Sequence, residues 1–216
     1  MTKVKICGIS DKKHAIAAIE AGADFIGVVF AQSIRMVTPE QAKGIVDAIR
    51  QASTTVKTVG IFANMPADEI NRIARDCDLD MVQLSGDESW EYCIDIEKPV
   101  IKAIHMQAQR DDTDQTAIFG VEHISDNDNV YIVLLDTHTE GKYGGTGISF
   151  NWKLAKSIST KYPIIVAGGL KPNNVKEAIK KMKPWGVDVS SGVETDGEKD
   201  IAKIKKFIDE AKNETT

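Results

Sequence analysis

Eight short apolar runs, rich in Val and Ile, recur along the 216-residue chain with helix-like segments between them. They occupy residues 4–8, 25–30, 57–63, 81–86, 100–106, 131–137, 164–169 and 186–192. Continuous apolar runs are typical of strands buried on both faces, and the segments between them then form crossover helices of a parallel sheet. Eight strand–helix units favour a closed (β/α)8 barrel. A doubly wound open sheet is the alternative, because periodicity does not show whether the eighth strand meets the first.

Residues that typically begin and end helices support this division of the chain. They are Ser10 and Asp11, Thr38 with Pro39, and Lys171 with Pro172 before three helical segments, and Gly22 at the end of the first. The polar stretch 107–129 predicts a weak fifth helix with a solvated connection. The length favours one domain over two, so we expect residues 1–216 to form a single barrel domain.

Composition narrows the class of protein. The net charge is −5, with 42% hydrophobic and 27% charged residues, which excludes disordered and collagen-like classes. The acidic balance and the lack of basic clusters argue against nucleic acid as a partner. The apolar runs are too short to cross a membrane, and the first residues lack the features of a signal peptide. Three widely spaced cysteines without a CxxC motif predict free thiols, a reducing compartment and hence a cytoplasmic location.

Reactive side chains fall at the ends of two of the runs. In a (β/α)8 barrel the active site lies at the carboxyl ends of the strands. Cys7 ends the first run and Asp136 the sixth. A thiolate acting as base and a carboxyl group acting as general acid suit proton transfer at adjacent carbons. The structural alternatives are a small buried residue for Cys7 and a loop cap for Asp136. Other polar side chains at strand ends are Gln83, Ser85, Asp188, Ser190 and Ser191.

Anion-binding features accompany these residues. Arg35, after the second run, has a planar guanidinium group suited to a carboxylate, although a surface ion pair with Glu40 is an alternative. Glycine-rich loops follow the last runs, at AGGL, SSGVE and KYGGTG. In barrels, the loops after strands seven and eight form a recurrent phosphate site. The dinucleotide and P-loop motifs are absent from the sequence, and the histidines lack ligand spacing, so we expect no cofactor and no metal.

A set of motifs extends from Val4 to Phe207. It includes VKICGI, GADFIGVVF, Ser33-x-Arg35, TPEQA, VGIFAN, VQL-x-GDE, LLDT, K-x-GGTG, VAGGL-x-P and GVDVSSGVE. In combination these motifs resemble the phosphoribosylanthranilate isomerase family nearly end to end. The resemblance implies a (β/α)8 barrel of tryptophan biosynthesis, which agrees with the fold expected from periodicity. It also implies a cofactor-free Amadori rearrangement of a small phosphoribosyl substrate.

The resemblance implies roles for individual residues. Asp136 would be the general acid that protonates the ribose ring oxygen, and Cys7 the general base that takes the proton from ribose C2. Arg35 would hold the anthranilate carboxylate. The phosphate would be bound by backbone amides around three residues at the ends of strands seven and eight, which are Gly169, Ser191 and Gly192. Gly145 and Asp188 complete the expected substrate contacts.

One motif departs from the family pattern, because Ser85 stands where the family usually has a histidine. This departure bears on the rate of the reaction rather than on its class. Two other functions remain open. The related histidine-pathway aldose–ketose isomerase carries an aspartate where Cys7 stands, and a barrel could also bind phosphoribosyl ligands without turnover. We expect a monomer or a homodimer.

Overall fold

The computed structural model describes residues 1–105, 130–136, 156, 158–160 and 162–213. Eight parallel strands form a closed barrel in which each strand pairs with its neighbour in the sequence and β8 pairs with β1. The strands are β1 (Lys3–Ile6), β2 (Phe25–Val29), β3 (Lys57–Phe62), β4 (Met81–Leu84), β5 (Val100–His105), β6 (Val130–Asp136), β7 (Ile164–Ala167) and β8 (Gly186–Val189). The predicted barrel is therefore confirmed, and the open sheet is not the fold.

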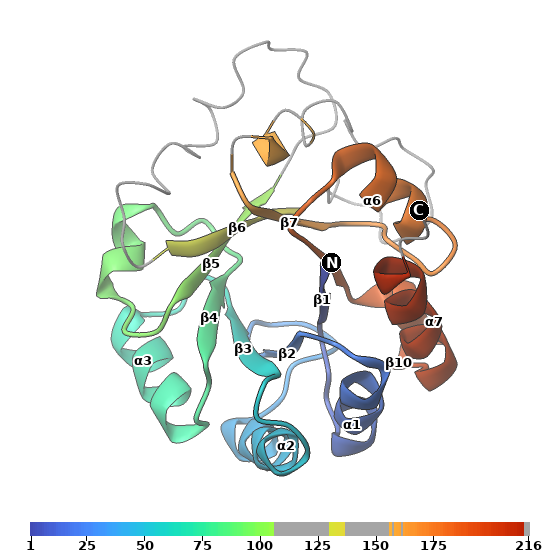
Figure 1. The fold of residues 1–216 in the computed structure, drawn as a ribbon. Coiled ribbons are helices and arrows are strands. Elements are labelled where there is room, and N and C mark those ends of the chain that lie inside the picture. Colours follow the sequence, from blue (N-terminus) through green and yellow to red (C-terminus); the bar gives the residue numbers. More distant parts are fainter. Residues whose placement is uncertain (106–129, 137–155, 157, 161, 214–216) are drawn as a thin grey trace.

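The strands divide the apolar side chains between two cores. In β5, Ile101 and Ala103 lie in the cluster inside the barrel, whereas Val100 belongs to the larger cluster between the sheet and the helices. This alternation follows from the pleat of a strand, which sends successive side chains to opposite faces. Because both faces are covered, the strands are continuous apolar runs. The helices lie around the outside of the barrel in Figure 1.

Helix boundaries follow local capping chemistry. The helices in the described ranges include α1 (Lys12–Ala21), α2 (Pro39–Ala52), α3 (Ala67–Asp76), α6 (Val175–Met182) and α7 (Ile201–Lys212). The Asp11 side chain accepts a hydrogen bond from the His14 N–H at the start of α1, and Gly22 ends that helix with φ 98°. Thr38 forms a capping box with Gln41 at the start of α2.

Two boundaries differ from the expectation. Between β4 and β5 the chain forms the 3₁₀ helix η1 (Glu91–Asp95) in place of a crossover α-helix. Before α6 the chain makes a turn instead of entering the helix at Lys171 and Pro172. In that turn the Asn174 side chain accepts from the Lys171 N–H at 2.7 Å and donates to the Gly169 carbonyl at 3.0 Å, so the helix begins after Asn174. The expected helix in 107–129 lies outside the described residues.

The chain after β8 completes the carboxyl end of the barrel. It forms the 3₁₀ helix η3 (Ser191–Val193) and a small antiparallel pair, β9 (Glu194–Thr195) and β10 (Glu198–Lys199). α7 follows and returns alongside α1. This pair of short strands places two charged side chains, Glu194 and Lys199, beside the ends of β1 and β8.

Candidate active site

The expected catalytic residues lie at the carboxyl ends of β1 and β6. Cys7 directly follows β1 and is 8% exposed, and Asp136 is the last residue of β6 and is half-buried. Asp136 continues the inward-facing series of Ile132 and Leu134. In the closed barrel, β6 is separated from β1 by β7 and β8. The thiol and the carboxyl group therefore come from different sides of the barrel mouth.

Charged neighbours surround the Cys7 thiol. A β-carbon at Gly27 of β2 would lie 3.2 Å from Cys7 Sγ, so the glycine leaves space for the sulfur. Burial raises the pKa of the Cys7 thiol, and the carboxylate of Asp188 raises it further. The ammonium groups of Lys5 and Lys199 act in the opposite direction, but the net pKa lies above the ordinary value for cysteine. The thiol is thus a weak acid held beside two cations that favour its ionised form.

A buried ion pair underlies the thiol. Lys5 of β1 is opposite Asp188 of β8 in the sheet register, and Lys5 Nζ lies 2.9 Å from Asp188 Oδ1. The Lys5 side chain is completely buried. Burial by itself lowers the pKa of Lys5, but Asp188 and Cys7 more than offset it, so the net pKa is raised. The sequence analysis did not single out Lys5, although its place two residues before Cys7 puts both side chains on the same face of the strand.

The Arg35 side chain reaches β9, after the end of β8, rather than helix α2. Its Nε and Nη2 donate to the two carboxylate oxygens of Glu194 at 2.6 and 2.7 Å. The bidentate partner is thus Glu194, not the Glu40 considered as an alternative. Gly8, with φ 74°, lies under this side chain, because a β-carbon there would lie 2.6 Å from Arg35 Cδ. A substrate carboxylate would therefore share the guanidinium group with Glu194 or displace it.

Glu194 is held by a second cation. Lys199 Nζ lies 2.6 Å from Glu194 Oε1 and also donates to the Ser190 carbonyl at 2.9 Å. Burial raises the pKa of Glu194, but hydrogen bonds from Arg35 and Lys199 outweigh it and the net pKa is lowered. The carboxylate is therefore ionised at neutral pH and fixes the positions of Arg35 and of Lys199, the cation that acts on Cys7. Neither Glu194 nor Lys199 was predicted, since nothing local in the sequence links them to Arg35.

The loops after β7 and β8 contact each other at the expected phosphate site. Gly169 has φ 67°, and a β-carbon there would meet nothing within 4 Å. A β-carbon at Gly192 would lie 1.8 Å from the Leu170 carbonyl oxygen, so only glycine allows the two loops to approach this closely. Ser191 opens the short helix η3 next to them. Gly145, the remaining expected contact, lies outside the described residues.

With this geometry in view, the family can be assigned from the whole chain. The sequence model of N-(5'-phosphoribosyl)anthranilate isomerase matches residues 4–210. The chain belongs to the phosphoribosylanthranilate isomerase family. The resemblance noted from the motifs is therefore confirmed.

Relatives from this isomerase family align over almost the full chain. An N-(5'-phosphoribosyl)anthranilate isomerase of Dehalococcoides mccartyi is 48% identical over 217 residues, which cover 99% of this chain and 97% of the relative. One of Geobacter metallireducens is 44% identical, covering 98% of this chain and all of the relative. A crystal structure of the isomerase from Thermotoga maritima is 36% identical, with a TM-score of 0.85 and coverage of 98% and 99%.

A second solved member of the isomerase family carries a ligand. It is 34% identical, has a TM-score of 0.81, covers 98% of this chain and 99% of its own, and is in complex with reduced 1-(o-carboxyphenylamino)-1-deoxyribulose 5-phosphate. That ligand contains both a carboxylate and a phosphate. The present chain has a guanidinium group and glycine-rich loops at the mouth, the two kinds of group that bind such anions.

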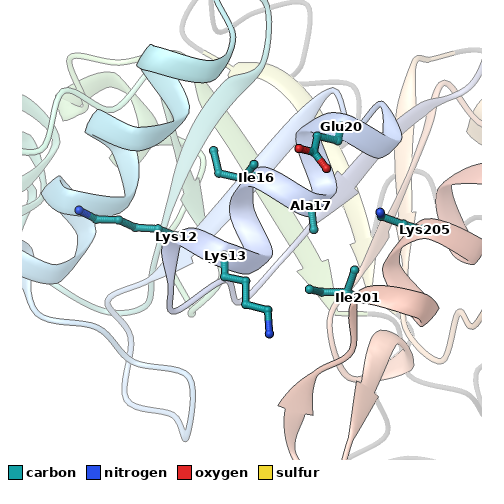
Figure 2. A pocket seen from close by; sticks show the side chains of 7 residues that line it. All are labelled: Lys12, Lys13, Ile16, Ala17, Glu20, Ile201 and Lys205. Carbon is teal, nitrogen blue, oxygen red and sulfur yellow. The ribbon is translucent and has the colours of Figure 1, made fainter.

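Other features of this isomerase-family chain lie away from the mouth. A shallow hollow between α1 and α7 is lined by Lys12, Lys13, Ile16, Ala17, Glu20, Ile201 and Lys205, on the outer side of the barrel (Figure 2).

Within the described residues, no three His, Cys, Asp or Glu side chains are grouped so that they could hold a metal ion. None of the helices in the described ranges is long and apolar enough to span a membrane.

Proposed function

We propose that this chain converts N-(5'-phosphoribosyl)anthranilate to 1-(2-carboxyphenylamino)-1-deoxyribulose 5-phosphate in tryptophan biosynthesis, with Cys7 as general base and Asp136 as general acid. Its membership of the isomerase family supports the reaction. The observation that supports these roles of Cys7 and Asp136 is the placement of a buried thiol and a half-buried carboxyl group at the ends of β1 and β6. A general acid and a general base on different sides of one mouth match a reaction that needs both.

The chemistry consists of proton transfers within one substrate. Asp136 protonates the ribose ring oxygen, the C1–O bond breaks, and the anthranilate nitrogen and C1 form a Schiff base. The Cys7 thiolate takes the proton from C2, which gives an enolamine that tautomerises to the ketone. C2 is oxidised from alcohol to ketone while C1 is reduced from imine to amine. The electrons therefore balance inside the substrate without an external oxidant or reductant.

Three sets of groups bind the ends and the centre of the substrate in this proposal. Arg35 holds the anthranilate carboxylate, and the backbone N–H groups of Gly169, Ser191 and Gly192 hold the phosphate together with the loop that contains Gly145. Asp188, 8% exposed beside Cys7, contacts the ribose. Binding the charged ends of the substrate away from C1 and C2 uses that binding energy to orient the reacting carbons.

The test follows the loss of anthranilate fluorescence after the protein is mixed with freshly generated phosphoribosylanthranilate. We expect rapid decay with the wild-type protein, and no decay above background with Cys7→Ala or Asp136→Asn. Both variants should still bind the reduced product analogue, because the two residues act on protons. Near-normal rates in either variant would refute its assigned role. A stable signal with the wild-type protein would favour the histidine-pathway substrate or a binding function without turnover.

The remaining expectations form part of the same proposal. Residues 1–216 act as one catalytic domain without cofactor, as a monomer or a homodimer, and nucleic acid and membranes are not partners. A cytoplasmic location is supported by the cysteines, since Cys7, Cys77 and Cys93 are all buried and free.

A further inference from the structure

Three linked polar side chains lie at the ends of β4 and β5, and the reaction described above uses none of them. Gln83 Nε2 donates to Ser85 Oγ at 2.9 Å, and His105 Nε2 lies 2.8 Å from the Ser85 carbonyl oxygen. By the alternation of the strands these are inward-facing positions, because Met81 and Ala103 of the same series lie inside the barrel. We call Gln83, Ser85 and His105 the β4–β5 polar group.

One buried atom of this group lacks a partner. Gln83 is 5% exposed, and its Oε1 accepts no hydrogen bond within the described part of the chain. If the amide were flipped, Oε1 could accept a hydrogen bond from the Ser85 hydroxyl, but Nε2 would then lack a hydrogen-bond partner. A buried amide atom without a partner is costly, and native proteins satisfy such atoms with protein, water or a ligand. On this side of the mouth, the Gln83 amide can therefore form one hydrogen bond to a bound molecule.

The bond to Ser85 also fixes the form of the His105 ring. A carbonyl oxygen only accepts, so Nε2 carries a hydrogen, and in a neutral imidazole of this tautomer Nδ1 is an acceptor. Nδ1 has no hydrogen-bond partner in the described ranges, and the residue is exposed. His105 is paired in register with Asp136 on the next strand, and neighbouring strands lie about 4.8 Å apart. His105 therefore stands on the strand next to that of the proposed general acid, and its ring contacts Ser85 on β4.

We propose that His105 and Gln83 bind hydroxyl groups of the substrate ribose on the β4–β5 side of the mouth, with His105 Nδ1 accepting from one hydroxyl and Gln83 Oε1 accepting from a second. This inference rests on the proposed function, in which Asp136 contacts the ribose ring oxygen. A group one strand away from Asp136 then faces the ring hydroxyls. His105 is a substrate-binding residue that positions the ring between Cys7 and Asp136.

The test compares the affinity of three variants for the reduced product analogue by titration calorimetry. His105→Leu removes the acceptor and should weaken binding and raise KM by about tenfold, the effect of one hydrogen bond. His105→Asn keeps a donor for Ser85 and an acceptor for the ligand, and should stay within about threefold of the wild type. The matched control is His14→Leu, on α1 outside the barrel, which should leave affinity unchanged. Far-ultraviolet circular dichroism confirms that each variant is folded.

The outcomes separate this inference from the proposed function. If the wild type binds and converts its substrate and His105→Leu has the same affinity and KM, the inference is wrong and the proposed function stands. If His105→Asn loses as much affinity as His105→Leu while both remain folded, hydrogen bonding by this residue is not the reason for binding and the inference also fails. A wild type that neither binds the analogue nor turns over the substrate would contradict the proposed function itself.

Gln83→Met provides an independent check, because it removes the amide with its unpartnered Oε1 at nearly constant volume. Affinity for the same analogue should fall by about tenfold, while the stability of the folded protein should change little, because removal of the unpartnered Oε1 offsets the loss of the hydrogen bond to Ser85 Oγ. Unchanged affinity in a folded Gln83→Met variant would exclude Gln83 from the binding surface.

Discussion

Replacing Lys5 with methionine tests whether the buried ion pair below Cys7 organises the site. The two charges lie 2.9 Å apart, and the Lys5 side chain is fully buried while that of Asp188 is 10% exposed. At an effective dielectric constant of about 20 their attraction is about 6 kcal/mol. Desolvation of two ions costs several kcal/mol each, so the net contribution of the intact pair is small. Removing one partner is different, because it leaves a carboxylate buried without a cation.

We expect Lys5→Met to lower the free energy of unfolding by about 3–5 kcal/mol at pH 7, the range for breaking a buried pair on one side. The double variant Lys5→Met/Asp188→Asn removes both charges and should recover most of this loss. Urea denaturation followed by circular dichroism measures all three proteins. A single variant within about 1 kcal/mol of the wild type would refute the reasoning, as would a double variant less stable than the single one.

The pH dependence provides a second check on the same pair. The pKa of Lys5 in the folded protein is raised above the ordinary value of about 10.4. Its contribution is therefore fully present below pH 10.4 and is lost as the pH rises through the folded value. In Lys5→Met, a carboxyl group buried without a cation prefers its neutral form, so the variant should recover stability as the pH falls toward about 4. A stability deficit that is the same at pH 7 and at pH 4.5 would contradict this account.

The same substitution should change the reactivity of the thiol. The ammonium group of Lys5 lowers the pKa of Cys7 against burial, which raises it. Without that cation the pKa of Cys7 rises further, and a base must be deprotonated to act. The pH at which turnover reaches half its maximum on the acidic side should therefore move upward in Lys5→Met. An unchanged pH profile would mean that Cys7 is not the base or that Lys5 does not act on it.

Two further substitutions test the binding of the charged ends of the substrate. Arg35→Ala should raise KM by about 10- to 100-fold through loss of charge-assisted hydrogen bonds, with little change in kcat, whereas Arg75→Ala on the exposed face of α3 should change neither. An unchanged KM in steady-state kinetics would remove the proposed carboxylate contact. Gly192→Ala places a methyl group 1.8 Å from the Leu170 carbonyl oxygen and should push the phosphate loops apart, at a cost of about 1–3 kcal/mol and at least a tenfold rise in KM. Gly197→Ala, in the β9–β10 turn with open space around it, should leave KM unchanged, and equal effects of the two glycine variants would argue against the phosphate site.

The sequence by itself determined the strands, both ends of α1, the start of α2 and the two expected catalytic positions. A strand covered on both faces must be continuously apolar, so all eight strands could be located from their Val and Ile content. Asp11 and Thr38 cap their helices through bonds to residues three positions away, which local sequence reveals. Cys7 and Asp136 could be named because they directly end such strands.

Only the tertiary structure decided which distant groups meet. Lys5 and Asp188 are 183 positions apart, and Arg35 and Glu194 are 159 apart. Nothing in either local segment specifies its partner. These pairs exist because β8 closes against β1, and closure depends on the tilt and stagger of all eight strands together. The same packing brings His105 of β5 between Ser85 and Asp136, so the polar lining of the mouth is a property of the closed barrel rather than of any one motif.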